Sequence, residues 1–286
     1  MADRLAQDTA MGVVELLVRD LDAMIAYYAT GIGLDVLEHT GPAAVLGRGS
    51  TPIVRLRAER DLPGFSRGDA GLFHTAILFD SGPALARALA GVARFAPASF
   101  TGAADHLVSE AFYFDDPEGN GVELYLDRPR ERWARTPGGG VRMASLPLEP
   151  NTFLREHLTS AAPPPGAAPD AMVGHVHLQV GDIATAREFY VDTLGFDVMA
   201  TFGSQALFVA AGGYHHHIGM NTWNSAGAGP RAASLGLGRV SIELPTADEV
   251  TALGDRLRSA GLRGRHDGAT LRFEDPWNTL IEVSAA

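Results

Sequence analysis

Apolar and polar residues alternate along several short stretches of the chain, a period that predicts β-strands. The first such strand runs from Val13 to Val18, and a helical period follows from Leu21 to Thr30, with Asp20 placed as its N-cap. Three further strands are predicted after this helix, at 34–38, 43–46 and 53–56. This order is one β-α-β-β-β unit, and the first ten residues look like a loose tail before it.

The same pattern recurs along the chain, which is the sequence signature of repeated structural units. The segment from Asp20 to Gly33 returns as Asp182 to Gly195, at a constant offset of 162 residues (182 − 20 and 195 − 33). A second motif, Phe-Asp-Asp-Pro at Phe114, returns as Phe-Glu-Asp-Pro at 273–276. Four β-α-β-β-β units are therefore predicted, near 11–60, 70–127, 172–224 and 238–284.

We expect two domains, at 9–128 and 171–286, because units 1 and 2 precede a long connector and units 3 and 4 follow it. The connector, 129–170, contains three consecutive glycines at 138–140 and three prolines at 163–165, so it is predicted to be partly irregular. A short helix is expected at 151–158.

The composition excludes several classes of function. Net charge is −11 and we find no stripe of Lys or Arg, which argues against nucleic acid and acidic membrane surfaces. The absence of cysteine excludes disulfides and thiolate metal sites, so any metal must use His, Asp, Glu or Tyr. No signal-peptide pattern and no apolar run of membrane-spanning length is found, and we expect a cytoplasmic protein.

The stretch from His106 to Glu123 predicts a strand, a tight turn and a second strand. In the second strand Val122 and Leu124 share one face, so Glu123 lies on the other, near His106 and Tyr113. A carboxylate, an imidazole and a phenol on one sheet face are costly to bury unless a ligand binds there.

Histidines gather at equivalent strand positions of the units. His74 lies in the first strand of unit 2, His175 and His177 lie in that of unit 3, and the run His215, His216 and His217 opens the last strand of unit 3. Strand parity places His217 and Asn221 on the polar face. Two imidazoles and one carboxylate leave open positions on a metal, as in non-haem Fe(II) oxygenases.

The chain resembles the vicinal-oxygen-chelate superfamily, which contains glyoxalase I, bleomycin-resistance proteins and extradiol ring-cleaving dioxygenases. More narrowly, it is similar to bacterial catechol 2,3-dioxygenases. The matching segments are Gly71 to His74, Glu123 to Arg130, Gly174 to Leu178 and Gly212 to Gly219, together with the extradiol signature His106, Phe112, Tyr113, Asp116, Pro117, Gly119 and Glu123. The resemblance implies an α+β fold whose four βαβββ units form two incomplete curved β-barrel cavities.

The resemblance also implies the site residues and the reaction. Fe(II), or alternatively Mn(II), would be held by His74, Glu123 and His175 and would bring O₂ to a small aromatic diol, catechol or a substituted catechol. Tyr113 would hydrogen-bond the bound substrate oxygen, and His106 would line the pocket. The acid/base histidine would be His217 or His216, and parity favours His217. We expect four further residues in the substrate pocket, namely His177, Phe73, Asn221 and Trp223.

One departure from the extradiol pattern affects the fold. The signature lies in the N-terminal half, where unit 1 has Val13 and Glu15 in place of two histidines. We therefore predict that unit 2 pairs with unit 3 across the halves. Units 1 and 4 would form a second, degenerate cavity with Arg239 and Glu282. A rival arrangement pairs unit 3 with unit 4 and gives the ligand set His175, His217 and Glu282.

Two other functions remain open at this stage. A glyoxalase-like isomerase or lyase would bind Ni(II) or Zn(II) through His74, Glu123, His175 and His217. A bleomycin-resistance-type protein would bind a small molecule in a metal-free aromatic cleft. The oligomeric state is open, and a homo-oligomer is allowed.

Overall fold

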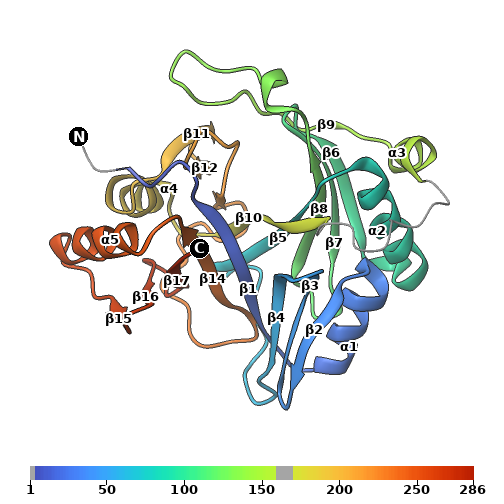
Figure 1. Cartoon of the computed structure of the whole chain (residues 1–286), viewed down its shortest axis with the longest axis horizontal. Helices are drawn as coiled ribbons and strands as arrows, with labels where there is room; N and C mark the ends of the chain where they lie inside the picture. Colours follow the sequence, from blue (N-terminus) through green and yellow to red (C-terminus); the bar gives the residue numbers. More distant parts are fainter. Residues whose placement is uncertain (1–3, 159–169) are drawn as a thin grey trace.

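The computed structural model describes residues 4–158 and 170–286, which form two curved β-sheets with helices on their outer sides (Figure 1). In each repeat unit the first strand is followed by a helical segment and three more strands, and the first strand pairs in parallel with the last. The predicted α+β fold of four βαβββ units is confirmed.

Units 1 and 4 together form an eight-stranded sheet. Across the sheet its strands are β15 (Arg265–His266), β16 (Thr270–Glu274), β17 (Leu280–Ala285), β14 (Gly236–Leu244), β1 (Ala10–Val18), β4 (Thr51–Ala58), β3 (Ala43–Arg48) and β2 (Asp35–Thr40). The antiparallel pair β1–β14 joins the two units and sets Glu15 opposite Arg239.

Units 3 and 2 form the nine-stranded sheet, to which the connector adds one short strand. Its strands are β11 (Asp197–Phe202), β12 (Ala206–Ala210), β13 (Ile218–Asn221), β10 (Ala171–Gln179), β5 (Gly71–Phe79), β8 (Gly121–Asp127), β7 (Ser109–Asp115), β6 (Phe100–Asp105) and β9 (Leu146–Pro147). The antiparallel pair β5–β10 sets His74 opposite His177.

Each sheet thus takes one unit from each half of the chain, which confirms the predicted pairing of unit 2 with unit 3. The rival pairing of unit 3 with unit 4 is wrong, because Glu282 lies in β17 of the other sheet from His175. The domain bounds at 9–128 and 171–286 stay a prediction.

The helical segments follow the sequence periods closely. They are α1 (Leu21–Ala26) with η1 (Tyr27–Ile32), α2 (Gly82–Phe95), η2 (Pro97–Ser99), η3 (Arg130–Arg132), α3 (Pro150–His157), α4 (Ile183–Arg187) with η4 (Glu188–Thr193), and α5 (Ala247–Ser259). The first helix ends in a π-helical turn, and Gly33 stops it at φ +88°, a value that favours glycine. Within the described residues, no helix is long and apolar enough to cross a membrane.

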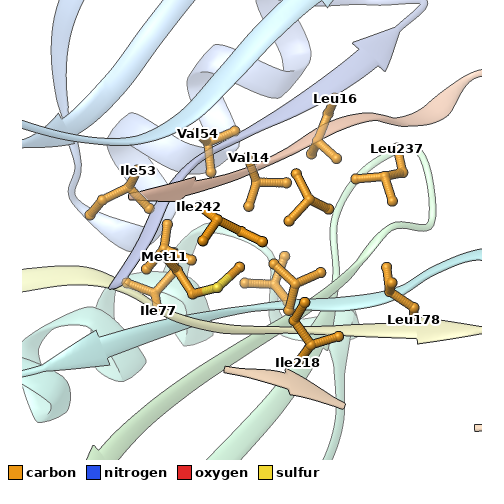
Figure 2. Packing of buried hydrophobic residues seen from close by; sticks show 14 of the residues in the cluster. Met11, Val14, Leu16, Ile53, Val54, Ile77, Leu178, Ile218, Leu237 and Ile242 are labelled. Carbon is orange, nitrogen blue, oxygen red and sulfur yellow. The ribbon is translucent and has the colours of Figure 1, made fainter. Parts of the chain in front are cut away.

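The main hydrophobic core lies between the two sheets. Figure 2 shows Val14 and Ile242 of the eight-stranded sheet close to Ile77, Leu178 and Ile218 of the nine-stranded one. All five side chains are at most 2 % exposed. Burial of this face leaves the opposite face of each sheet free to carry polar groups.

Two segments outside the units behave differently from each other. The predicted loose tail is wrong for its described part, because the Leu5 N–H donates to Gly195 O at 3.0 Å and the Leu5 side chain is buried. In the connector, the predicted short helix is confirmed as α3, whose Phe153 ring lies 5.0 Å from that of Phe112. The three prolines lie outside the described residues.

Candidate functional site

Three neighbouring strands of the nine-stranded sheet bring His74, Glu123 and His175 together. Ala76 of β5 lies opposite Glu123 of β8 on one side and opposite His175 of β10 on the other. His74 is two residues from Ala76, so all three side chains project from the same face. These are the predicted metal ligands, and they come from both halves of the chain.

The hairpin between β7 and β8 places Tyr113 beside Glu123, its cross-strand partner. Its turn is held by the Asp116 carboxylate, which accepts hydrogen bonds from the backbone N–H groups of Glu118 and Asn120, each at 2.9 Å. Gly119 takes φ +86°, so the Asp-Pro-Glu-Gly sequence forms a tight turn. Asp116 of the signature is thus structural.

The ligand atoms converge on one carboxylate oxygen. Nε2 of His74 lies 2.9 Å from Oε2 of Glu123, and Nε2 of His175 lies 3.2 Å from the same oxygen. One ligand atom from each of the three residues lies within 4.8 Å of the other two, and all three residues are buried. Among the described residues, Nε2 of His74 has no hydrogen-bond partner although it lies close to Oε2 of Glu123, so its lone pair is available to a cation.

These residues fit a metal ion. Ligand atoms at right angles and about 2.1 Å from a metal lie about 3 Å apart, close to the two distances measured from Oε2. A buried carboxylate with two imidazoles suits a divalent transition metal, since it supplies one negative charge and two nitrogen ligands. His74, His175 and Glu123 could hold such an ion without rearrangement of the backbone.

Electrostatics keep these groups in their metal-binding forms. Burial lowers the pKa of His175 to about 4, so its imidazole is neutral near pH 7. Burial alone would raise the pKa of Glu123, but the imidazoles of His175 and His74 outweigh it and hold that pKa well below its usual range. An ionised carboxylate and a neutral imidazole are what a metal ion requires.

His106 and Tyr113 form a second pair at the same cavity. Nδ1 of His106 donates to the Ala144 carbonyl of the connector at 2.7 Å, which fixes the tautomer of a neutral ring. Nε2 of that ring then accepts from the Tyr113 hydroxyl at 2.6 Å. Burial raises the pKa of Tyr113 well above its usual value, and the negative charge of Glu123 adds to the effect, so the phenol stays protonated.

His216, rather than His217, lines the cavity. Its ring centroid is 4.0 Å from that of His175. The Asp127 carboxylate accepts from Nε2 of His215 at 2.9 Å, so a neutral His215 presents an unprotonated Nδ1. That atom accepts from Nδ1 of His216 at 2.7 Å, and the lone pair of His216 is left on Nε2.

The parity argument expects His217 on the cavity face, but the described cavity lining includes His216 and not His217. β13 begins only at Ile218, and the preceding stretch contains Gly212 and Gly213 at φ +60° and +67°, so strand alternation does not extend back to the histidine run. The Nδ1 of His217 instead accepts the backbone N–H of Ala211 at 3.2 Å. His217 therefore lies outside the cavity.

The cavity itself has a volume of about 460 Å³ and includes the metal cluster, Tyr113, His106 and His216. Of the four residues expected to bind substrate, Phe73, His177 and Trp223 line it. Asn221 does not: its amide donates to Nε2 of His177 at 3.0 Å and its carbonyl accepts the Trp223 N–H at 3.1 Å. Asn221 lies on the predicted face of the sheet, but the His177 side chain lies between Asn221 and the cavity.

Several residues of the site carry no sequence motif that would have identified them. His215 and Asp127 were part of matched segments, yet only their hydrogen bonds link them to His216. Met143, Phe202 and Phe208 line the cavity but belong to the connector and to strands with no motif.

The equivalent place in the eight-stranded sheet holds ion pairs. Arg239 occupies the position of His74 and lies 2.7 Å from Glu282, the counterpart of Glu123. Arg272 approaches the same carboxylate at 2.7 Å. No imidazole contributes to these contacts among the described residues, in agreement with the predicted degenerate site.

Comparisons with known proteins agree with this geometry. A family model described as "Glyoxalase/Bleomycin resistance protein/Dioxygenase superfamily" matches residues 172–283. The catechol-2,3-dioxygenase of Bacillus subtilis (strain 168) is 36% identical over 276 residues, which cover 94% of this chain and 95% of that protein. The chain belongs to this superfamily. Because the relative spans nearly the whole chain, the prediction of a dioxygenase is also confirmed.

Solved structures agree on the fold of this dioxygenase. Glyoxalase I from Zea mays aligns with a TM-score of 0.60 at 16% identity and covers 97% of this chain and 92% of its own. The cppA protein from Streptococcus pneumoniae TIGR4 aligns with a TM-score of 0.55 at 9% identity and covers 97% of each chain. At such identities the likeness shows the fold alone.

The metal-free dioxygenase is expected to lose stability as the pH falls from about 6.5 to 5. Burial lowers the pKa of His175 to about 4 and of His217 to about 3, whereas an unfolded histidine titrates near 6.5. In this window the unfolded state binds more protons, so the free energy of unfolding decreases on acidification by about 1 kcal/mol per pH unit for each such imidazole.

Asp116, whose pKa burial raises to about 6, opposes this trend, but buried imidazoles outnumber such carboxyls. The net loss should be at least about 2 kcal/mol between pH 6.5 and 5, measured by urea denaturation at fixed ionic strength. Equal stability at the two pH values would show that these imidazoles are not held neutral.

Proposed function

We propose that this protein is a non-haem Fe(II)-dependent extradiol dioxygenase that opens the ring of catechol or a substituted catechol beside its hydroxyl pair. The observation that carries the proposal is the meeting of His74, His175 and Glu123 within 4.8 Å at the cavity. The 36% sequence identity with the Bacillus subtilis catechol-2,3-dioxygenase supports the same chemistry. The substrates are a small aromatic diol and O₂, whose two atoms both enter the product.

His74, His175 and Glu123 would hold the metal ion, with Fe(II) as the first choice and Mn(II) as the second. When bound, the ion would supply adjacent open positions for the diol and O₂ and a path for electrons between them. The protein's own task is then to orient the diol and to manage its protons.

His216 would be the base that takes a proton from the diol. Burial lowers its pKa well below the usual range, so the ring enters the reaction neutral. The hydrogen bonds from Asp127 through His215 direct its free lone pair to Nε2. In hydrolytic triads a carboxylate orients the catalytic imidazole directly, whereas here His215 lies between the carboxylate and His216.

Tyr113 and His106 would steady the second substrate oxygen. Since the Tyr113 hydroxyl donates to His106, its oxygen remains free to accept a hydrogen bond from a diol hydroxyl. The pair is fixed before substrate binds, because the Ala144 carbonyl holds His106 in place.

The alternatives fit the cavity less well. A glyoxalase-like site with four ligands would need His217, which lies outside the cavity. A metal-free binding cleft would leave the buried Glu123 carboxylate without a cation and Nε2 of His74 without a hydrogen bond.

Reconstitution tests the proposal. Protein loaded anaerobically with Fe(II) and then mixed with catechol and air should give the yellow ring-cleavage product and consume one O₂ per catechol, followed in an oxygen electrode and a spectrophotometer. Protein prepared in the same way without metal is the control. Absence of colour and of O₂ uptake with several catechols, in protein shown to hold iron, would contradict the proposal.

A further inference from the structure

We propose that the preferred substrate is a catechol that bears a large, uncharged, apolar substituent, such as a second aromatic ring. This rests on the proposed function and concerns the part of the cavity that the diol itself does not fill. Three observations carry it: the size of the cavity, the aromatic side chains along one wall, and the pairing of its charges.

The cavity is much larger than one ring. An apolar cavity of about 150 Å³ suffices to hold benzene, whereas this one measures about 460 Å³. The metal cluster occupies one end, where the hydroxyl pair would bind. Room for roughly a second ring remains between that end and the opening.

Aromatic rings lead from the metal cluster to the surface. The Phe73 ring lies 5.4 Å from that of His74 and 5.4 Å from that of Trp223. Phe208 and Phe202, whose rings are 6.4 Å apart, continue this wall. Trp223 and Phe202 are each 47% exposed, so their apolar surface is available for a substituent to cover.

The described residues of the cavity wall offer no unpaired Arg or Lys for a charged substituent. Among its described lining residues Arg67 is the only Arg or Lys, and it already pairs with Asp115 at 2.6 Å. Nε2 of His177 accepts a hydrogen bond from the Asn221 side-chain amide at 3.0 Å, so this nitrogen offers no proton to a carboxylate. A carboxylate on the substituent would be desolvated without a partner, which is unfavourable.

Binding to Fe(II)-loaded protein under anaerobic conditions tests the inference without turnover. Isothermal titration calorimetry should be carried out with catechol, 3-phenylcatechol and 4-phenylcatechol. The phenylcatechol that binds more tightly should have a Kd about 30-fold below that of catechol, because its second ring is buried in the cavity. 3,4-Dihydroxyphenylacetate should bind no better than catechol. Equal Kd values for phenylcatechols and catechol, tighter binding of the carboxylate, or no binding of any of them would overturn the inference.

Variants locate the substituent. The preference is defined as the ratio of the catechol Kd to the phenylcatechol Kd. Trp223→Ala should lower this ratio by about 10-fold, and Phe202→Ala, made separately, should lower it by about 3-fold. Phe95→Ala is the matched control, because Phe95 is 44% exposed on α2 and does not line the cavity. A preference unchanged in both cavity variants, or lowered equally in Phe95→Ala, would overturn the inference.

The two proposals fail in different ways. Tight binding of phenylcatechol by iron-loaded protein that produces no ring-cleavage product would support the substrate class and contradict the dioxygenase function. Cleavage of catechol without preference for the phenyl compounds would do the reverse.

Discussion

Glu123→Ala is expected to abolish metal binding and ring cleavage while the fold survives. Glu123 supplies the oxygen on which the ring nitrogens of His74 and His175 converge, at 2.9 and 3.2 Å. Without it the site has two imidazoles and no negative charge to balance a dication. Metal affinity should fall by at least about 10³-fold, beyond the roughly 10–100-fold typical of residues that only hydrogen-bond a ligand.

The fold should survive because Glu123 points into the cavity and not into the main core. Iron content after dialysis, measured by mass spectrometry, gives the metal result, and thermal unfolding checks the fold. Glu282→Gln is the matched control, since Glu282 occupies the same place in unit 4 but contacts arginines. Retention of iron by folded Glu123→Ala would move the metal site elsewhere.

His216→Asn is expected to lower kcat for ring cleavage by about 10²–10⁴-fold, the range typical of a lost general base. His216 lines the cavity beside His175, and its tautomer is held by the hydrogen bond that it donates to His215, which in turn donates to Asp127. Iron content should stay close to that of the parent protein, because His216 is not one of the three proposed ligands.

His217→Asn is the control, because an amide oxygen can accept the Ala211 N–H that His217 accepts now. Its kcat should remain within about threefold of the parent value, far above that of the His216 variant. Steady-state kinetics with saturating O₂ separates kcat from KM. A larger loss in the His217 variant than in the His216 variant would reverse the assignment.

The repeats explain why so much of the fold could be predicted. A constant offset between units exposes the β-α-β-β-β order, and each short strand then needs only its alternating pattern. The pairing of units followed from chemistry: Val13 and Glu15 cannot replace two imidazoles, so unit 2 needed unit 3. The sheet order bears this out.

The sequence predictions failed where the local pattern of residues does not determine which way a side chain points. β13 begins only at Ile218, and the irregular stretch before it contains two glycines at positive φ, so the parity that favoured His217 did not apply to the histidine run. Asn221 lies on the expected face, but no pattern reveals that His177 takes up its amide. The wall formed by Phe202 and Phe208 depends on packing between distant segments.

The central claim is that one metal ion binds between His74, Glu123 and His175, side chains from opposite halves of the chain. Anomalous diffraction at the iron edge from crystals of Fe(II)-loaded protein tests this most directly. A single strong peak within bonding distance of these three side chains is predicted. A peak held instead by His175, His215 and His216, the other histidine group whose ring nitrogens lie within 4.8 Å of one another, would contradict the account.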